Sequence, residues 1–181
     1  MKILIISDTH RNLARMGEIM AAAEDVDRIV HLGDMSADAR ELSRLTKREI
    51  ISVNGNCDSD FSDENYKFLE TECGRILLLH GHREHVKSGL LRLCSRAVEL
   101  ACTAVFFGHT HVACVRKQNG VTLVNPGSPT YPAGGANPSY AIAYTQTSGL
   151  SVSIVYIDPG DALPRKRIRK KTKIITKDVT V

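Results

Sequence analysis

The chain has 181 residues, of which 43% are hydrophobic and 24% charged, and these values suit one globular domain with a substantial core. The apolar run in MKILIISDTH is too short to span a membrane and no small-residue cleavage site follows it, so we expect neither a transmembrane segment nor a secretion signal. Five cysteines without CxxC spacing favour a reducing compartment, and we expect a cytoplasmic protein.

The first part of the chain alternates apolar strands with amphipathic helices. We expect strands over residues 2–7, 28–33 and 49–55. One helix should follow Asn12, which is a candidate N-cap, and another should cover about 37–46. This alternation of strand and helix favours a parallel sheet.

The rest of the chain is richer in strands. The predicted segments are two strands within 67–81, a long helix over 85–101 and a strand over 102–108. Two hairpins follow, one turning at Asn119-Gly120 and the other around Ser148-Gly149. The sequence therefore predicts an α/β body with a β-rich second half.

Side chains of the types that bind metals follow five of the predicted strands. They are Asp8 and His10, Asp34, Asn56 and Asp58, His80 and His82, and His109 and His111. Ligand sites in open α/β sheets form outside the carboxyl ends of the strands, so these groups should converge. Each of these residues also has an ordinary structural reading when taken singly. An Asp could cap the next helix, and an HxH pair could lie on a solvated strand edge or pack together. Asn56 could belong to a turn, and His80 could be a core histidine. Their joint occurrence favours a metal site, and neighbouring glycines leave room for close approach: Gly33, Gly55, Gly81 and Gly108.

The same residues fall into blocks that resemble a known family. The blocks are DTH (8–10), GD (33–34), GNCD (55–58), HGH (80–82) and GHTH (108–111). In order and spacing they are similar to the five signature blocks of the calcineurin-like metallophosphoesterases. The chain resembles the small phosphodiesterase branch of that superfamily in its short length and in the GNCD block. NPGS (125–128) is similar to another block of this branch. The resemblance covers about residues 1–157 and implies an α/β (α+β) fold, a four-layer αββα sandwich of two mixed β-sheets flanked by helices, with a dinuclear metal site at the strand ends.

The resemblance also implies a ligand set. Asp8, His10 and His111 would hold one metal, Asn56, His80 and His109 a second, and Asp34 would bridge the two. Carboxylate, amide and imidazole donors suit divalent ions, of which we expect Mn²⁺ first, with Ni²⁺, Fe²⁺ and Zn²⁺ as alternatives. Two such ions would lower the pKa of a bound water molecule, so the nucleophile would be water and not a side chain.

Three further side chains are catalytic candidates: Cys57, Asp58 and His82. Many larger members of the superfamily carry a histidine, thought to protonate the leaving group, where this chain has Cys57. A thiol with an ordinary pKa of about 8.5 is a poor acid near neutrality. We therefore expect a preference for diesters with good leaving groups, with His82 or a metal-bound water as proton donor. In the alternative reading Cys57 only packs beside the site. Arg11, where branch members commonly carry glycine, is either a cation at the rim or a solvated side chain.

Positive charge is concentrated at the C-terminal end. Residues 165–181 hold eight Lys or Arg and one acid, whereas residues 1–164 hold sixteen and nineteen. We divide the chain into a metallophosphoesterase domain, 1–160, and a basic tail, 161–181. The tail is either a solvated extension or a segment that binds nucleic acid or an anionic surface. Its end, 175–181, alternates like a strand that pairs with a sheet edge or with a neighbouring subunit, so a homo-oligomer is among the expected arrangements.

The resemblance thus implies a hydrolase acting on a small or nucleotide-like phosphodiester. Two alternatives stay open, a non-catalytic scaffold that binds a protein partner, as a retromer subunit of similar fold does, and a nuclease guided by the basic tail. Each of the seven ligand positions carries a competent side chain, and this favours the enzyme.

Overall fold

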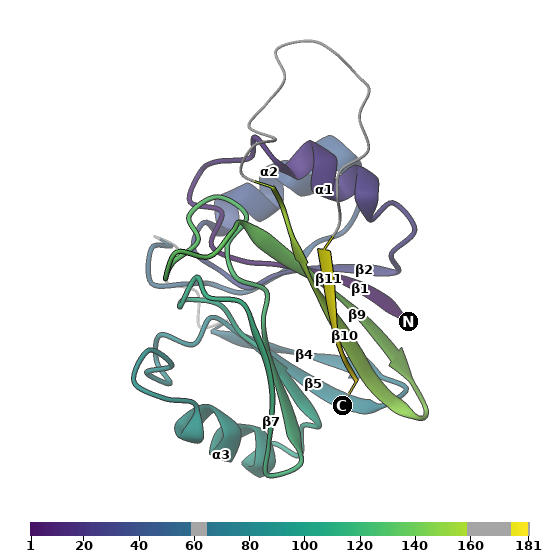
Figure 1. The fold of residues 1–181 in the computed structure, drawn as a ribbon, viewed down its shortest axis with the longest axis vertical. Coiled ribbons are helices and arrows are strands. Elements are labelled where there is room, and N and C mark those ends of the chain that lie inside the picture. The colour runs from purple at the N-terminus through teal and green to yellow at the C-terminus, as the bar shows by residue number, and fades with distance from the viewer. Residues whose placement is uncertain (59–64, 159–174, 181) are drawn as a thin grey trace.

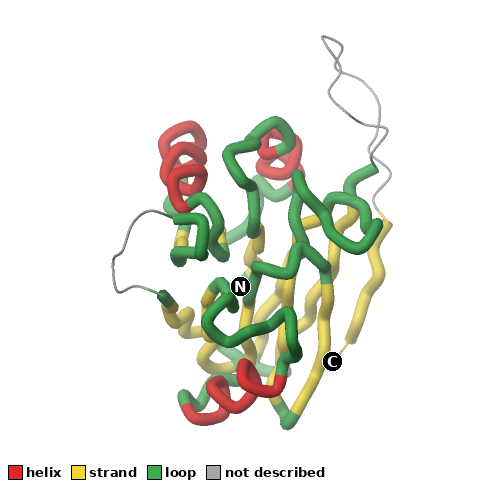
Figure 2. Tube along the Cα trace, turned by 90° about the vertical axis from the view of Figure 1, so that its left-hand side faces the viewer, coloured by secondary structure: helices red, strands yellow, loops and turns green. Residues whose placement is uncertain are grey.

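The computed structural model describes residues 1–58 and 65–158, and it describes the backbone of 175–180. Two β-sheets lie face to face, with α1 (Met16–Ala22) and α2 (Ser36–Thr46) beside one sheet and α3 (Leu91–Glu99) beside the other (Figures 1 and 2). The predicted four-layer αββα sandwich is therefore confirmed.

The first sheet has six strands in the order β11-β10-β9-β1-β2-β3. Their bounds are β1 Lys2–Ile6, β2 Arg28–His31, β3 Ile51–Ser52, β9 Ser139–Gln146, β10 Gly149–Tyr156 and β11 Ile175–Thr180. β1, β2 and β3 run parallel, as the βαβ alternation predicts, while β9 pairs antiparallel with β1. The sheet is mixed, and the carboxyl ends of its three parallel strands lie along one edge.

The second sheet has five strands in the order β4-β5-β6-β8-β7. Their bounds are β4 Tyr66–Thr71, β5 Gly74–Leu79, β6 Ala104–Phe106, β7 Cys114–Gln118 and β8 Val121–Asn125. β5, β6 and β8 are parallel, and the outer strands β4 and β7 are antiparallel to their neighbours. The two predicted hairpins are β7–β8 and β9–β10.

Alternating side chains on the central strands build the layers. In β1, Ile3 and Ile5 lie in the core between the sheets, whereas Leu4 and Ile6 pack with residues of α1 and α2. β5 alternates in the same way between the core and α3. Because both faces of these strands are covered, their sequences read as continuous apolar runs.

Two predicted helix boundaries are wrong. α1 begins at Met16, four residues after Asn12, whose side-chain oxygen instead accepts a hydrogen bond from the Ala14 amide at 3.2 Å in a local turn. The predicted helix over 85–101 is confirmed only over α3. His85 and Gly89 have φ angles of 54° and 147°, so the residues before α3 form turns, although their apolar spacing is typical of a helix.

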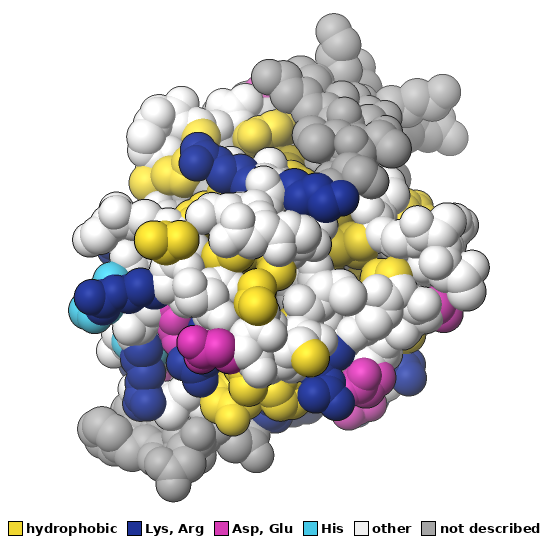
Figure 3. All heavy atoms as spheres, turned by 90° about the horizontal axis from the view of Figure 1, so that it is seen from below, with side chains coloured by type: hydrophobic (Ala, Val, Ile, Leu, Met, Phe, Trp, Pro, Cys, Tyr) yellow, Lys and Arg dark blue, Asp and Glu magenta, His cyan; other side chains and the backbone are white. Residues whose placement is uncertain are grey.

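The end of the predicted tail forms part of the first sheet. β11 pairs antiparallel with β10, with Ser151 opposite Thr180, which fits the predicted pairing with a sheet edge. The basic cluster itself, residues 165–173, lies outside the described residues. On the face seen in Figure 3, Lys and Arg side chains are interspersed with Asp and Glu. Within the described part of the chain, no helix is both long and apolar enough to cross a membrane.

Candidate metal centre

The ends of strands from both sheets meet at the site. Asp8 and His10 follow β1, Asp34 follows β2, His80 follows β5, and His109 and His111 follow β6. Hydrogen bonds join these ends, because Asp8 donates from its amide to the Gly33 carbonyl at 3.1 Å and accepts at Oδ2 from the His109 amide at 3.1 Å. The structure therefore brings together six of the predicted residues, from four of the five predicted strand ends.

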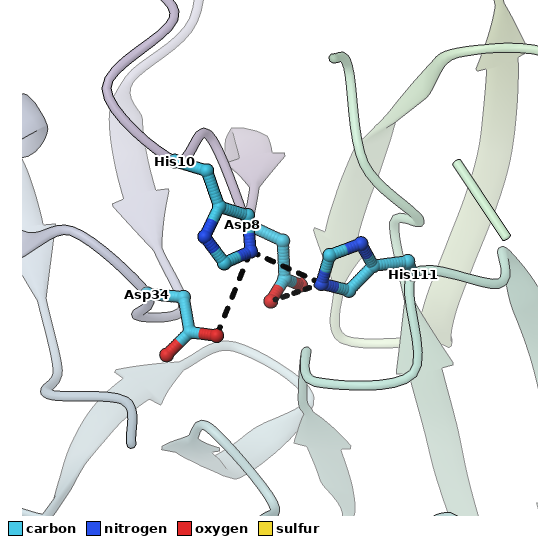
Figure 4. A group of neighbouring side chains, drawn as sticks. All are labelled: Asp8, His10, Asp34 and His111. Atoms are coloured by element: carbon cyan, nitrogen blue, oxygen red, sulfur yellow. Dashed lines mark hydrogen bonds and ion pairs between the residues drawn. The ribbon is translucent and has the colours of Figure 1, made fainter. Parts of the chain in front are cut away.

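The first cluster contains Asp8, His10, Asp34 and His111, whose ligand atoms all lie within 4.8 Å of one another (Figure 4). His111 Nε2 is 3.3 Å from Asp8 Oδ1, and His10 Nε2 is 3.6 Å from Asp34 Oδ2. The two Nε2 atoms are themselves 3.2 Å apart. Two carboxylates and two imidazoles thus face a common point, as they would around a divalent cation.

The second cluster contains Asp34, His80 and His109. His80 Nε2 lies 3.3 Å from Asp34 Oδ1, and the ring centroids of His80 and His109 are 5.1 Å apart. Asp34 therefore belongs to both clusters and turns a different carboxylate oxygen to each. His109 and His111, although separated by one residue, belong to different clusters.

Backbone carbonyls fix the orientation of two histidines. His80 Nδ1 donates to the Leu32 carbonyl at 2.7 Å, and His111 Nδ1 donates to the Tyr131 carbonyl at 2.6 Å. A carbonyl only accepts, so Nδ1 carries the hydrogen and Nε2 of the neutral ring keeps its lone pair. Both Nε2 atoms are thereby presented to the clusters as ligands.

Burial and charge favour a cation in these clusters. Asp8 Oδ1 and His80 Nε2 are buried and have no hydrogen-bond partner among the described residues. Burial lowers the pKa of His109 to about 4, so its imidazole is neutral near pH 7. Although burial acts in the opposite direction, interactions with His80 hold the pKa of Asp34 well below its usual range. The ionised Asp34, the neutral His109 and the buried atoms without hydrogen bonds fit bound divalent ions. Nearby carboxylates raise the pKa of His80, against the effect of burial, and that of His111, so an ion would compete with protons for these two rings.

Unusual backbone geometry accompanies the ligands. Five of the candidate ligands have φ angles between 46° and 68°: Asp8, His10, Asp34, His109 and His111. For residues other than glycine this conformation costs roughly 1–3 kcal/mol each and is concentrated at functional sites. His109 and His111 therefore do not extend β6, and the loop conformation directs them to different clusters.

The loop that carries the other candidates lies beside Asp34. The Cys57 amide donates to Asp34 Oδ1 at 2.9 Å, and Asp58 accepts from the amides of Ser36 at 2.5 Å and Gly55 at 2.7 Å. Asp58 thus ties this loop to the start of α2, which favours a positioning role over direct catalysis. Asn56 is exposed, and its amide nitrogen lies 3.4 Å from Cys57 Sγ, so its role as a ligand stays a prediction.

His82 and Cys57 have different acid–base environments. His82 is half-buried, with its ring centroid 5.4 Å from that of His80 and 6.2 Å from that of His109. Burial, together with the charges of His80 and Arg83, lowers the pKa of His82. Burial and the nearby carboxylates of Asp34 and Asp58 raise the pKa of Cys57 to about 11. The thiol is therefore protonated and a weak acid, as the sequence predicts.

The structure adds residues that sequence reasoning did not assign to the site. Thr9 Oγ1 donates to Asp38 Oδ2 at 2.6 Å and lies 3.0 Å from His31 Nε2, while Asp38 Oδ2 also accepts from the Arg11 amide at 2.8 Å. This buried network joins the loop after β1 to β2 and α2. The predicted βαβ order brings these elements together, but nothing in the sequence pattern singles out their polar partners.

The NPGS segment, residues 125–128, forms hydrogen bonds with loops that carry the clusters. Asn125 Nδ2 donates to the Gly108 carbonyl at 2.8 Å and to Thr110 Oγ1 at 3.1 Å. Ser128 Oγ donates to the Asp8 carbonyl at 2.8 Å. The segment therefore holds two of the three loops that carry the first cluster, those after β1 and β6.

The fold and the His and Asp clusters are those of a metal-binding phosphoesterase. Residues 1–148 match the calcineurin-like phosphoesterase superfamily domain, and the chain belongs to this superfamily.

Two curated relatives are named for the same chemistry. The chain is 34% identical over 155 residues to YsnB of Bacillus subtilis, a probable metallophosphoesterase, with 84% of this chain and 89% of the relative covered. It is 28% identical over 159 residues to the phosphodiesterase YfcE of Escherichia coli K12, with 78% and 86% covered.

Solved structures share the fold. A Streptococcus pneumoniae protein described as a predicted phosphoesterase superposes with a TM-score of 0.74 at 23% identity, covering 97% of each chain. Vps29 of Entamoeba histolytica, solved with Zn²⁺, superposes with a TM-score of 0.77 at 20% identity, covering 98% of this chain and 99% of Vps29. At these identities the likeness shows the fold alone.

Proposed function

We propose that this member of the superfamily is a phosphodiesterase that uses two divalent metal ions. The observation that carries the proposal is the position of Asp34, which turns Oδ2 to His10 at 3.6 Å and Oδ1 to His80 at 3.3 Å. One carboxylate between two imidazole clusters suits a bridging ligand. The phosphodiesterase name of the relative YfcE supports the reaction.

The chain's own residues would hold the ions as follows. Asp8, His10 and His111 serve one ion, Asn56, His80 and His109 serve the other, and Asp34 serves both. When bound, such a pair of ions lowers the pKa of a water molecule and neutralises charge on the phosphate. The donor set has no thiolate, and we expect Mn²⁺, with Ni²⁺, Fe²⁺ and Zn²⁺ as alternatives.

Fixed geometry is the main contribution of the protein. His80 and His111 are oriented by carbonyl acceptors, so little reorganisation is needed when a phosphate arrives. His82 is our candidate for the group that meets the leaving oxygen, because it lies at the edge of the second cluster. A neutral imidazole still offers an N–H hydrogen bond there. We place the protein in the cytoplasm on its cysteine pattern alone.

The test is the hydrolysis of bis(p-nitrophenyl) phosphate by metal-stripped protein to which Mn²⁺ or Ni²⁺ is restored. We expect metal-dependent turnover that falls by at least about 100-fold in Asn56→Ala and His80→Ala, because each removes one ligand. The matched control is His85→Ala, since His85 is an exposed histidine outside both clusters. Absence of turnover with two ions bound per chain would refute the enzyme and favour a protein-binding scaffold.

A further inference from the structure

Tyr131 is a large aromatic side chain at the rim of the first cluster. Its ring centroid lies 5.8 Å from that of His10, with the planes at 80°, yet 51% of the residue is exposed to solvent. The proposed phosphodiesterase chemistry gives this ring no role. An aromatic ring that is half in solvent beside a candidate ligand is placed to contact whatever the metal centre holds.

The backbone of Tyr131 is fixed to the site. Its amide donates to Ser128 Oγ at 2.8 Å, and the same oxygen donates to the carbonyl of Asp8 at 2.8 Å. Its carbonyl accepts from His111 Nδ1 at 2.6 Å, and the Ala133 amide donates to the His111 carbonyl at 3.0 Å. The ring is therefore carried by backbone that is tied to two candidate ligands, and only its two side-chain torsions are left to be fixed against a bound ligand.

The neighbouring loop is also apolar at its surface. Val112 directly follows His111 and is 42% exposed. The hydrogen bond between Ala133 and His111 sets the Tyr131 loop beside the one that carries Val112. Two apolar side chains, Tyr131 and Val112, thus lie beside the first cluster, which fits a ligand that carries both a phosphate and a flat apolar group.

We propose that Tyr131 determines substrate specificity by stacking on a planar aromatic group of the phosphoester, such as an aryl ester or a nucleobase. The inference rests on the proposed function, because the metal centre must hold the phosphate. Stacking is tolerant of the identity of the ring, since every aryl group and base has a π-face. Esters with small alkyl groups gain nothing from Tyr131.

The test is calorimetric binding of three monoesters to metal-loaded protein: phenyl phosphate, thymidine 5′-monophosphate and methyl phosphate. Tyr131→Ala should weaken at least one of the two aromatic esters about tenfold and leave methyl phosphate within about twofold. Loss for phenyl phosphate alone identifies an aryl ester as the ligand, and loss for the nucleotide alone identifies a base. Tyr131→Phe, which keeps the ring, should retain wild-type affinities.

Tyr144→Ala is the matched control, because Tyr144 is 44% exposed and pairs with Lys2 at the amino end of β1, away from the site. Equal weakening of all three esters in Tyr131→Ala would show that the residue only supports the loop, and unchanged affinities would show that the ring is not used. Either result overturns the inference, as does a Tyr131→Phe variant that behaves like Tyr131→Ala. Aromatic-selective binding without any diester hydrolysis would refute the proposed function and leave the stacking role standing.

Discussion

Asp34 shows how a single residue links the two clusters. Its two oxygens face different histidines, and the Cys57 amide donates a hydrogen bond to Oδ1, the oxygen that faces His80. The sequence predicts that Asp34 lies at a strand end, and the resemblance implies that it bridges. The backbone donor from Cys57 is a contact that neither predicts, because it depends on the turn that Asp58 fixes.

The chemistry of Cys57 leads to a prediction about leaving groups. Its pKa of about 11 makes the thiol a weak proton donor. In Cys57→His, an imidazole in this position should assist poor leaving groups, and we expect the ratio of alkyl monoester to diester turnover to rise by about tenfold or more. Steady-state rates with ethyl phosphate and bis(p-nitrophenyl) phosphate measure it, with Cys57→Ala as control. An unchanged ratio would show that this position has no influence on leaving-group protonation.

His31 makes stability depend on pH. Burial lowers its pKa from 6.5 to about 4. Between these values the unfolded chain binds a proton at His31 that the folded protein does not, so the free energy of unfolding falls as the pH drops through this window. At 1.36 kcal/mol per pKa unit the full loss is on the order of 3 kcal/mol.

Urea unfolding of the metal-free protein, kept in a chelator, at pH 7, 5.5 and 4 measures this dependence. The wild type should lose more stability than His31→Asn by about that amount over the window. Comparison with the variant cancels contributions from the other titrating groups. Parallel pH dependences in the two proteins would contradict the assignment.

At the scale of elements, the existence of the buried strands is the best predicted part of the molecule, although their bounds are shorter than predicted, as in β3, which covers Ile51–Ser52 and not 49–55. Continuous apolar runs identify β1, β2 and β5 because both faces of these strands are buried. The start of α3 is less predictable, since the left-handed conformations of His85 and Gly89 override apolar spacing. Sequence patterns report local periodicity, whereas loop conformation depends on distant contacts.

One close approach between loops can be tested directly. A Cβ added to Gly55 would lie 2.4 Å from the Asp34 amide nitrogen and 2.2 Å from its Oδ1. The Asp34 backbone could relieve this clash only by moving, which would distort the loop. Gly55→Ala should therefore destabilise the protein by roughly 1–3 kcal/mol and weaken metal binding. Thermal unfolding and metal titration measure both effects.

Gly17→Ala is the matched control for this substitution. Gly17 lies in α1, and a Cβ added there would have nothing within 4 Å. Alanine also favours a helix by up to about 1 kcal/mol over glycine, so we expect unchanged or raised stability and unchanged metal binding. If both variants behaved alike, the close packing of the Gly55 loop on Asp34 would be wrong.

At the scale of the whole molecule, the site depends on residues that are distant in the chain. Ser128 contacts the carbonyl of Asp8, 120 positions away, and Asn125 holds the loop that begins at Gly108. The resemblance identifies NPGS as a block, but its supporting role emerges only when the two sheets are stacked. Fold class and candidate ligands are therefore predictable from sequence, whereas the contacts that orient them require the structure.

The measurement that tests the account most directly is hydrolysis of bis(p-nitrophenyl) phosphate as a function of Mn²⁺ bound per chain. Metal-stripped protein is titrated with the ion, and bound metal and initial rate are determined on the same samples. Because Asp34 joins two clusters, we predict that the first equivalent gives little turnover and that the rate rises with the second. Full activity at one equivalent, or turnover without metal, would contradict the two-metal account.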